Sequence, residues 1–196
     1  PGESASEPRP RRDAIGGGRE LPRRSRSPYN PRRGWQGRRP LDFGKVVAVL
    51  RSLDREGVRY VLVGGMAVNL HGLGRATADV DLFLAPDREN VERLKRALRE
   101  VFRDPSIDEI SADDLAGAYP TVRYVPRDES FVVDLIGRLG EAFRFEDLEA
   151  EDMTVEGVRV RVATPRTLHA MKKDTLRPVD RMDAEALRRK FGLAEE

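Results

Sequence analysis

The sequence predicts an α/β fold in which a small mixed sheet is flanked by helices, with a short helical part near the C-terminus. Three observations support this. An apolar segment, Tyr60–Val63, leads directly into a glycine pair, Gly64-Gly65. This pattern is typical of a buried strand that turns sharply into a helix. A second apolar segment, 79–84, contains two aspartates one residue apart. Residues 42–56 and 86–102 carry apolar side chains at the spacing of helices that bury one face.

Length and composition limit the class of protein. The 196 residues are enough for one domain with a hydrophobic core. The net charge of +2 at pH 7 divides unevenly, because residues 1–40 hold eleven arginines and four acids (+7), which leaves −5 for residues 41–196. The absence of cysteine excludes disulfides and thiol chemistry. No apolar run has membrane-spanning length and no apolar signal core is present, so we expect a soluble, cytoplasmic protein.

Residues 1–40 are rich in Pro, Gly, Ser and Arg and contain almost no aliphatic side chains. Such a segment buries too little apolar surface to offset the entropy lost on ordering. We therefore expect a disordered tail before a folded domain at 41–196. The tail has two interpretations. Its arginines, with Tyr29 and Trp35 among them, would bind RNA phosphates and stack on bases, or the tail is a solvated leader or sequence translated from upstream of the true start.

The first predicted helix has Asp42 as its N-cap and is terminated by Gly57. The first core strand follows at 58–63, and a short helix is expected at 66–71 after the glycine pair. His71 has two interpretations: a contact to substrate, or a histidine that closes the helix end by bonding to backbone.

The strand at 79–84 carries the central candidate site, Asp79 and Asp81. Side chains alternate along a strand, so both carboxylates project from one face. Carboxylates side by side repel each other, and a divalent cation relieves that repulsion. Hard oxygen ligands suit Mg²⁺ or Mn²⁺, often shared with substrate phosphates. The simpler alternative is an acidic pair that only faces solvent.

Further elements follow in order. Residues 104–120 are expected to be irregular, with a possible helix start at Ser111. Strands are expected at 121–125 and 131–136, a short helix at about 140–150, a hairpin at 153–162, and helices opened by Thr164 and at about 179–191. Within the strand at 131–136, Asp134 stands among buried-type residues. It is either a further catalytic acid or a strand-end acid paired with an arginine.

The segment from Gly64 to Leu84, GGMAVNLHGLGRATADVDLFL, resembles the first motif of the nucleotidyltransferase superfamily, which has the DNA-polymerase-β-like fold. Its fuller text resembles the AbiEii/AbiGii toxin branch, which includes MenT-like toxins. The resemblance covers about 41–190. It implies that Asp79, Asp81 and Asp134 bind the metal, and that Gly64 and Gly65 hold phosphates by backbone.

The resemblance also extends to the loop before the metal strand and to the C-terminal part. Arg75 and Thr77 belong to an R-x-T that accompanies the site in the family. The segment 164–183, TPRTLHAMKKDTLRPVDRMD, resembles the family's second signature. The matching positions are Lys172, Arg177, Asp180 and Asp183. A lysine there neutralises charge on leaving pyrophosphate, and the two aspartates orient Lys172 or Arg177. The alternative is a charged helix end with local ion pairs.

The resemblance implies a Mg²⁺- or Mn²⁺-dependent nucleotidyltransferase that moves NMP from an NTP to a hydroxyl acceptor and releases pyrophosphate. The expected acceptor is the 3′ end of tRNA, the expected role is that of a type IV-like toxin that blocks translation, and an antitoxin is a possible partner. Two alternatives remain open: transfer to a small molecule of the aminoglycoside type, and a non-catalytic nucleotide-binding or antitoxin module.

Overall fold

The computed structural model describes residues 41–127, 129 and 131–194. The predicted tail at residues 1–40 lies outside these residues, so its order and its two interpretations remain predictions. Within the described part, no helix is both long enough and apolar enough to cross a membrane.

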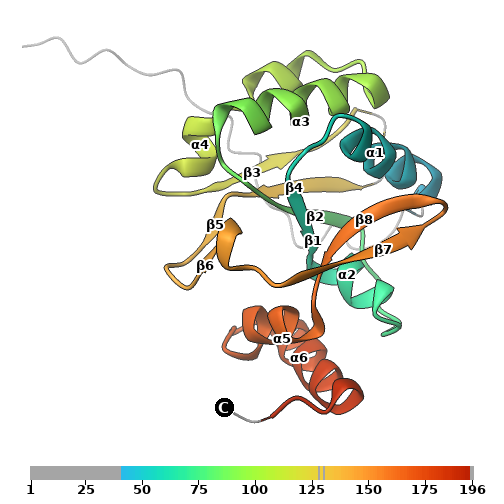
Figure 1. Cartoon of the computed structure of the whole chain (residues 1–196), viewed down its shortest axis with the longest axis vertical. Helices are drawn as coiled ribbons and strands as arrows, with labels where there is room; N and C mark the ends of the chain where they lie inside the picture. The colour runs from blue at the N-terminus through green and yellow to red at the C-terminus, as the bar shows by residue number, and fades with distance from the viewer. Residues whose placement is uncertain (1–40, 128, 130, 195–196) are drawn as a thin grey trace, which may run out of the picture. The chain divides into compact units, whose positions relative to one another are not determined.

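The described residues form a six-stranded sheet, a two-stranded hairpin and several helices (Figure 1). The helices are α1 (Phe43–Arg55), α2 (Gly64–Leu70), α3 (Arg88–Val101), α4 (Ala112–Ala116), α5 (Pro165–Lys173) and α6 (Pro178–Phe191), with 3-10 helices η1 (Pro105–Glu109) and η2 (Phe145–Asp147). The strands are β1 (Tyr60–Val63), β2 (Asp79–Leu84), β3 (Thr121–Tyr124), β4 (Val132–Ile136), β5 (Arg138–Leu139), β6 (Phe143–Arg144), β7 (Ala150–Val155) and β8 (Val158–Ala163).

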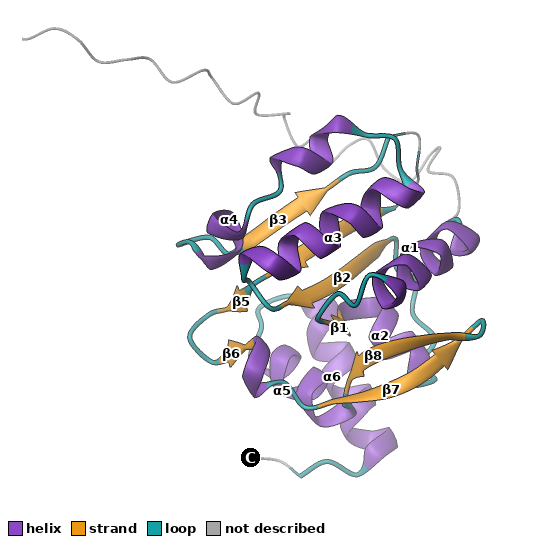
Figure 2. Ribbon diagram, turned by 45° about the horizontal axis from the view of Figure 1, so that its top comes forward, coloured by secondary structure: helices purple, strands orange, loops and turns teal. Residues whose placement is uncertain are grey.

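The large sheet is mixed, with strand order β3-β4-β2-β1-β8-β7. β2 pairs antiparallel with β1 and parallel with β4, while β8 lies parallel to β1. The edge strands β3 and β7 are antiparallel to their neighbours. Figures 1 and 2 show α1 and α3 over one face of the sheet and α2, α5 and α6 on the other. The predicted α/β class with a mixed sheet flanked by helices is therefore confirmed.

The alternation along β2 divides the site from the core. Val80, Leu82 and Leu84 are buried on one face of the strand, while Asp79 and Asp81 on the opposite face remain partly accessible. The carboxylates lie on the side of α2, since Asp81 approaches the first residue of that helix. The apolar face thus fixes the strand and leaves the acids at the surface of the core.

The predicted helix caps are confirmed. Asp42 accepts a hydrogen bond from the Lys45 backbone N at 3.1 Å, and Thr164 accepts one from the Thr167 N at 3.2 Å. Ser111 caps α4 in the same way. Each cap satisfies a backbone N–H that has no partner within the helix.

The predicted hairpin at 153–162 is also confirmed, with the turn at Glu156 and Gly157 between β7 and β8. Both residues have positive φ (47° and 73°), as a tight two-residue hairpin turn requires.

Several predictions about the elements were wrong or only partly right. The helix expected from Met66 begins at Gly64, so the glycine pair forms its first turn. Residues 140–150 form the turn after β5, the strand β6 and the short 3-10 helix η2 instead of an α-helix, because Gly140 turns the chain at φ +59°. Residues 104–120 contain η1, where no helix was expected, and α4, whose start at Ser111 was predicted. Phe191 of α6 is partly exposed and lies edge-on against His71.

Candidate active site

The structure brings the three candidate acids onto adjacent strands. Asp81 of β2 and Asp134 of β4 are paired residues in a parallel ladder, and Asp79 lies two residues before Asp81 on the same face. Neighbouring strands are about 4.8 Å apart, so paired side chains on one face are close. Three negative charges are thus concentrated in one small region.

This crowding changes the acidity of Asp81. Burial raises the pKa of the Asp81 carboxyl to about 6, and the charges of Asp134 and Asp79 add to that effect. The cations Lys172 and Arg75 act in the opposite direction. The Asp81 carboxylate therefore lies in a place that favours added positive charge.

The glycine pair fits closely around the acid and the loop before β2. Gly64 has φ +66°, and a Cβ there would lie 1.9 Å from Oδ2 of Asp81. A Cβ at Gly65 would lie 2.3 Å from Nη1 of Arg75 and 2.9 Å from Oγ1 of Thr77. Gly64 requires glycine because of its positive φ and the Asp81 side chain, whereas a side chain at Gly65 would first have to displace the end of Arg75 and the Thr77 hydroxyl.

A cluster of buried charges joins α5 to α6. Nζ of Lys172 lies 2.7 Å from Oδ1 of Asp180 and 2.9 Å from Oδ2 of Asp183. The three residues are only 6%, 7% and 7% exposed. The two carboxylates contact Nζ from α6, so they hold the end of the Lys172 side chain in place.

Two arginines extend this cluster. Nη1 of Arg75 lies 3.2 Å from Oδ2 of Asp183, which links the loop before β2 to α6. Nε of Arg177 lies 3.4 Å from Oδ2 of Asp180, and the Arg177 side chain is largely exposed. The candidate residues of the second signature and Arg75 are therefore parts of one network, and Arg177 is its member most accessible to a ligand.

The remaining polar residues of the loop position backbone. The Thr77 hydroxyl lies 3.3–3.4 Å from the backbone O and N of Asp79. Asn69 exchanges two hydrogen bonds of 2.7 Å with the backbone of Arg75. Nε2 of His71 lies 2.8 Å from the Ala163 carbonyl oxygen in a buried position, which favours the helix-end interpretation of this histidine.

Arg123 was missed by sequence reasoning. On the edge strand β3 it is paired with Asp134, and its Nε and Nη2 donate to the two carboxylate oxygens at 2.8 and 2.7 Å. Hydrogen bonding to Asp134 raises the pKa of the Arg123 guanidinium. The alternation of Thr121–Tyr124 was the available signal, but it identifies Arg123 only once the pairing with β4 is known.

The three carboxylates have the chemistry of ligands for a divalent cation, but in this structure they are not arranged as a metal site. Asp79, Asp81 and Asp134 offer hard carboxylate oxygens, and the pKa of Asp81 is raised first by burial and then by the charges of Asp134 and Asp79. However, no group of three or more His, Cys, Asp or Glu side chains among the described residues is already disposed to hold a metal. Asp134 instead directs both oxygens at Arg123.

The sheet carries acids on two neighbouring parallel strands, close to a helix that begins with two glycines and to a buried lysine. Comparison with known proteins assigns a chain with these features to the nucleotidyltransferases. Residues 48–189 match the profile of the family described as "Nucleotidyl transferase AbiEii toxin, Type IV TA system". The chain belongs to this AbiEii family and is a nucleotidyltransferase. No curated protein matches the sequence.

Solved structures give more distant likenesses. ANT(2")-Ia in complex with adenylyl-2"-tobramycin has 15% identity and a TM-score of 0.47, over 75% of this chain and 87% of that one. A candidate nucleotidyltransferase from Thermotoga maritima has 17% identity and a TM-score of 0.45, over 76% and 92%. The solution structure of ANT(2'')-Ia has 15% identity and a TM-score of 0.43, over 76% and 90%. These likenesses say nothing about the substrate of this chain.

Proposed function

We propose that the protein is a divalent-cation-dependent toxin that transfers NMP from an NTP to the 3′ end of tRNA and so blocks translation. The observation that carries the chemistry is the pairing of Asp81 with Asp134 across β2 and β4, close to Gly64. In a member of a nucleotidyltransferase toxin family, such a cluster of carboxylates is the natural place for the reaction.

In this proposal Asp79, Asp81 and Asp134 would hold the divalent cation. When bound there, the cation would supply stabilisation of the charge on the entering and leaving oxygens of an in-line displacement at phosphorus. Asp134 also accepts the proton of the attacking hydroxyl, after Arg123 has moved away from the Asp134 carboxylate. Arg123 has a largely exposed side chain, so it has room to move toward solvent.

The positive groups act on the triphosphate. Lys172 is close enough to Asp81 to lower the pKa of that carboxyl, so its ammonium group lies near the proposed reaction centre. It would neutralise charge on the departing pyrophosphate, as preorganised cations do in phosphoryl transfer. Asp180 and Asp183 are buried against Lys172 and act by orienting it.

The remaining residues shape the phosphate site. Gly64 and Gly65 hold phosphate oxygens by backbone N–H groups at the start of α2. Arg75 supports that turn from the loop before β2, and Thr77 fixes the backbone of Asp79. Arg177, exposed beside Asp180, offers its guanidinium to the nucleotide.

The acceptor is proposed from the family. The AbiEii description is that of a type IV toxin, and the motifs resemble those of MenT-like toxins, which extend tRNA. A chain of this family is expected to have a cognate antitoxin as its partner. The enzyme would therefore act on an RNA essential to translation, with the tRNA 3′ hydroxyl as the nucleophile.

A transfer assay tests this function. Purified protein, Mg²⁺ and total tRNA are incubated with each of four α-labelled NTPs, beside Asp81→Asn, Asp134→Asn and the control Asp113→Asn, an exposed acid on α4. We expect label on tRNA with wild type and the control only. Pyrophosphate release that needs a small hydroxylated compound would identify a small-molecule transferase. No transfer to either acceptor would favour a non-catalytic module.

A further inference from the structure

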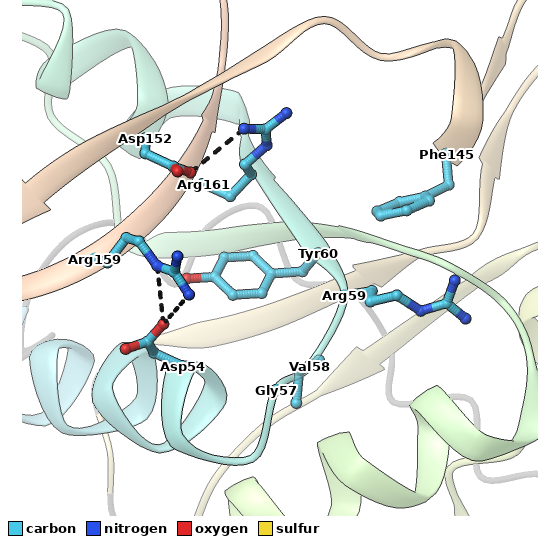
Figure 3. Close-up of a pocket in the computed structure, with 9 residues that line it drawn as sticks. All are labelled: Asp54, Gly57, Val58, Arg59, Tyr60, Phe145, Asp152, Arg159 and Arg161. Atoms are coloured by element: carbon cyan, nitrogen blue, oxygen red, sulfur yellow. Dashed lines mark hydrogen bonds and ion pairs between the residues drawn. The ribbon is translucent and has the colours of Figure 1, made fainter.

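A pocket lies away from the three acids, at the start of β1, whereas the acids lie near the end of β1 that leads into Gly64 (Figure 3). It has a volume of 380 Å³, within the range of small-ligand sites. Tyr60, the first residue of β1, lines it, whereas Gly64 follows the last. At about 3.3 Å per residue, Tyr60 and Gly64 are about 13 Å apart along the strand. The pocket is therefore distinct from the proposed reaction centre.

The Tyr60 hydroxyl is an unsatisfied polar group in this pocket. Tyr60 is 5% exposed, and the backbone N–H of Arg161 lies near its hydroxyl oxygen at a geometry short of a full hydrogen bond; the O–H donor has no acceptor among the described residues. Burial, and the charge of Asp54, raise the pKa of this phenol, so it stays protonated and able to donate. Buried hydroxyls nearly always have a partner, because leaving one unpaired is costly. The hydroxyl oxygen is almost fully covered, so a ligand oxygen would accept from it once a side chain at the pocket wall has moved.

Two arginines of β8 bring positive charge to the pocket. Arg159 directs Nε and Nη2 at a single Asp54 oxygen, both at 3.3 Å, and Nη1 of Arg161 lies 3.4 Å from Asp152. These contacts are long for hydrogen bonds to charged groups. A guanidinium has five N–H donors, and these two side chains are 71% and 50% exposed, so both can also bind an anion.

The lining has net positive charge and an aromatic surface. Arg59 also lines the pocket and pairs with Asp87 outside it, so three arginines face two aspartates within the lining. The Phe145 side chain projects toward the same space from η2, across from Tyr60 (Figure 3). Phosphate oxygens suit the arginines, and a flat base suits the phenyl ring.

We propose that this pocket binds a nucleotide unit, with its phosphate on Arg159 and Arg161, its base on Phe145 and an oxygen accepting from Tyr60. The unit is either a free nucleotide or one residue of an RNA strand, since both present the same groups. This binding site is additional to the transfer reaction and is tested without it.

Binding is measured by fluorescence anisotropy with two probes, a fluorescent AMP and a labelled single-stranded 12-nucleotide RNA, with EDTA present to suppress metal-dependent binding at the aspartates. The proteins are full-length wild type, the double variant Arg159→Ser/Arg161→Ser, Tyr60→Phe and the control Arg99→Ser. The control removes an arginine of α3 that pairs with Asp108 of η1, away from the pocket. We expect the double variant to bind at least tenfold more weakly, Tyr60→Phe several-fold more weakly, and the control like wild type.

The two probes distinguish the sources. Weakened AMP binding assigns the pocket to a free nucleotide, and a loss confined to the RNA assigns it to a strand. Any RNA binding by residues 1–40 is common to all four proteins, so photocrosslinking of a 4-thiouridine RNA checks location, with crosslinks expected at Tyr60 or Phe145. Equal binding of both probes by wild type and the double variant, or no binding by wild type, would overturn the proposal. If the double variant does not fold, Tyr60→Phe and Phe145→Leu decide in its place.

Discussion

The carboxylate of Asp81 fills the space that a side chain at residue 64 would need. A Cβ on Gly64 would lie 1.9 Å from Oδ2 and 2.9 Å from Cβ of Asp81, well inside van der Waals contact. The strand that carries the acid and the turn that opens α2 are therefore in direct contact. Any group bound by the turn would be next to the carboxylate.

Gly64→Ala is expected to abolish transfer while leaving a folded protein. The new methyl group must displace Asp81, and φ +66° adds about 1–2 kcal/mol of backbone strain. The matched control is Gly157→Ala, at φ +73° with nothing within 4 Å of the new Cβ. Both variants should lose stability in thermal unfolding, but only Gly64→Ala should lose activity, by at least 100-fold. Equal activities would show that the contact with Asp81 does not matter.

Without metal, the Asp81→Asn protein is expected to be more stable than the wild type, and the difference in stability should grow as the pH rises. The pKa of Asp81 is about 6 in the folded state against 3.8 for the free group, so between these values the folded protein binds more protons than the unfolded chain. Stability therefore falls as pH rises through this window, and the cost reaches about 3 kcal/mol near pH 7. Asparagine removes that cost.

The measurement is the melting temperature of both proteins from pH 5 to pH 7.5 in EDTA. The variant should melt higher, and the difference should grow with pH until about pH 7. Saturating Mn²⁺ should reduce the difference by stabilising only the wild type. A difference that does not change with pH would contradict the assignment.

Lys172→Met is expected to lose both stability and transfer. The substitution leaves Asp180 and Asp183 buried without their ammonium partner, a change that typically costs about 3–5 kcal/mol. Lys173→Met is the matched control, because this neighbouring lysine lies outside the buried cluster. Thermal unfolding and tRNA labelling should distinguish the two variants. A Lys173→Met protein with the larger defect would reverse their roles.

Arg123→Gln is expected to strengthen divalent metal binding in the absence of nucleotide. In the wild type the guanidinium holds both oxygens of Asp134, so a metal must displace it. Titration with Mn²⁺, followed by electron paramagnetic resonance of the free ion, should give a dissociation constant several-fold lower for the variant. Arg127→Gln, an exposed arginine on the loop after β3, is the control. Unchanged or weaker metal binding by Arg123→Gln would show that the arginine does not compete with a cation.

Local patterns predicted a large part of this fold. The apolar alternation of 79–84 predicted that Asp79 and Asp81 share a face, and the caps Asp42 and Thr164 predicted where two helices begin. Such features depend on neighbours in the chain, so sequence reasoning reaches them. The segment at 140–150 was assigned wrongly because its strand β6 forms only by pairing with β5 across the turn at Gly140.

The contacts that complete the site depend on residues far apart in the chain. The Arg123–Asp134 pair requires the register of β3 against β4, and the Arg75–Asp183 contact joins segments more than 100 residues apart. Neither register nor helix docking is written in a local pattern. The pocket at Tyr60 was missed for the same reason, since β1, β8 and η2 meet there only in the folded chain.

The order of the site residues along the chain has a consequence for synthesis. Asp81 is made first, its partner Asp134 follows about fifty residues later, and Lys172 with its two aspartates follows about forty residues after that. A nascent chain still on the ribosome therefore lacks the lysine cluster until α5 and α6 have emerged. If the enzyme blocks translation as proposed, each molecule gains that ability only after α5 and α6 have been made and have left the ribosome.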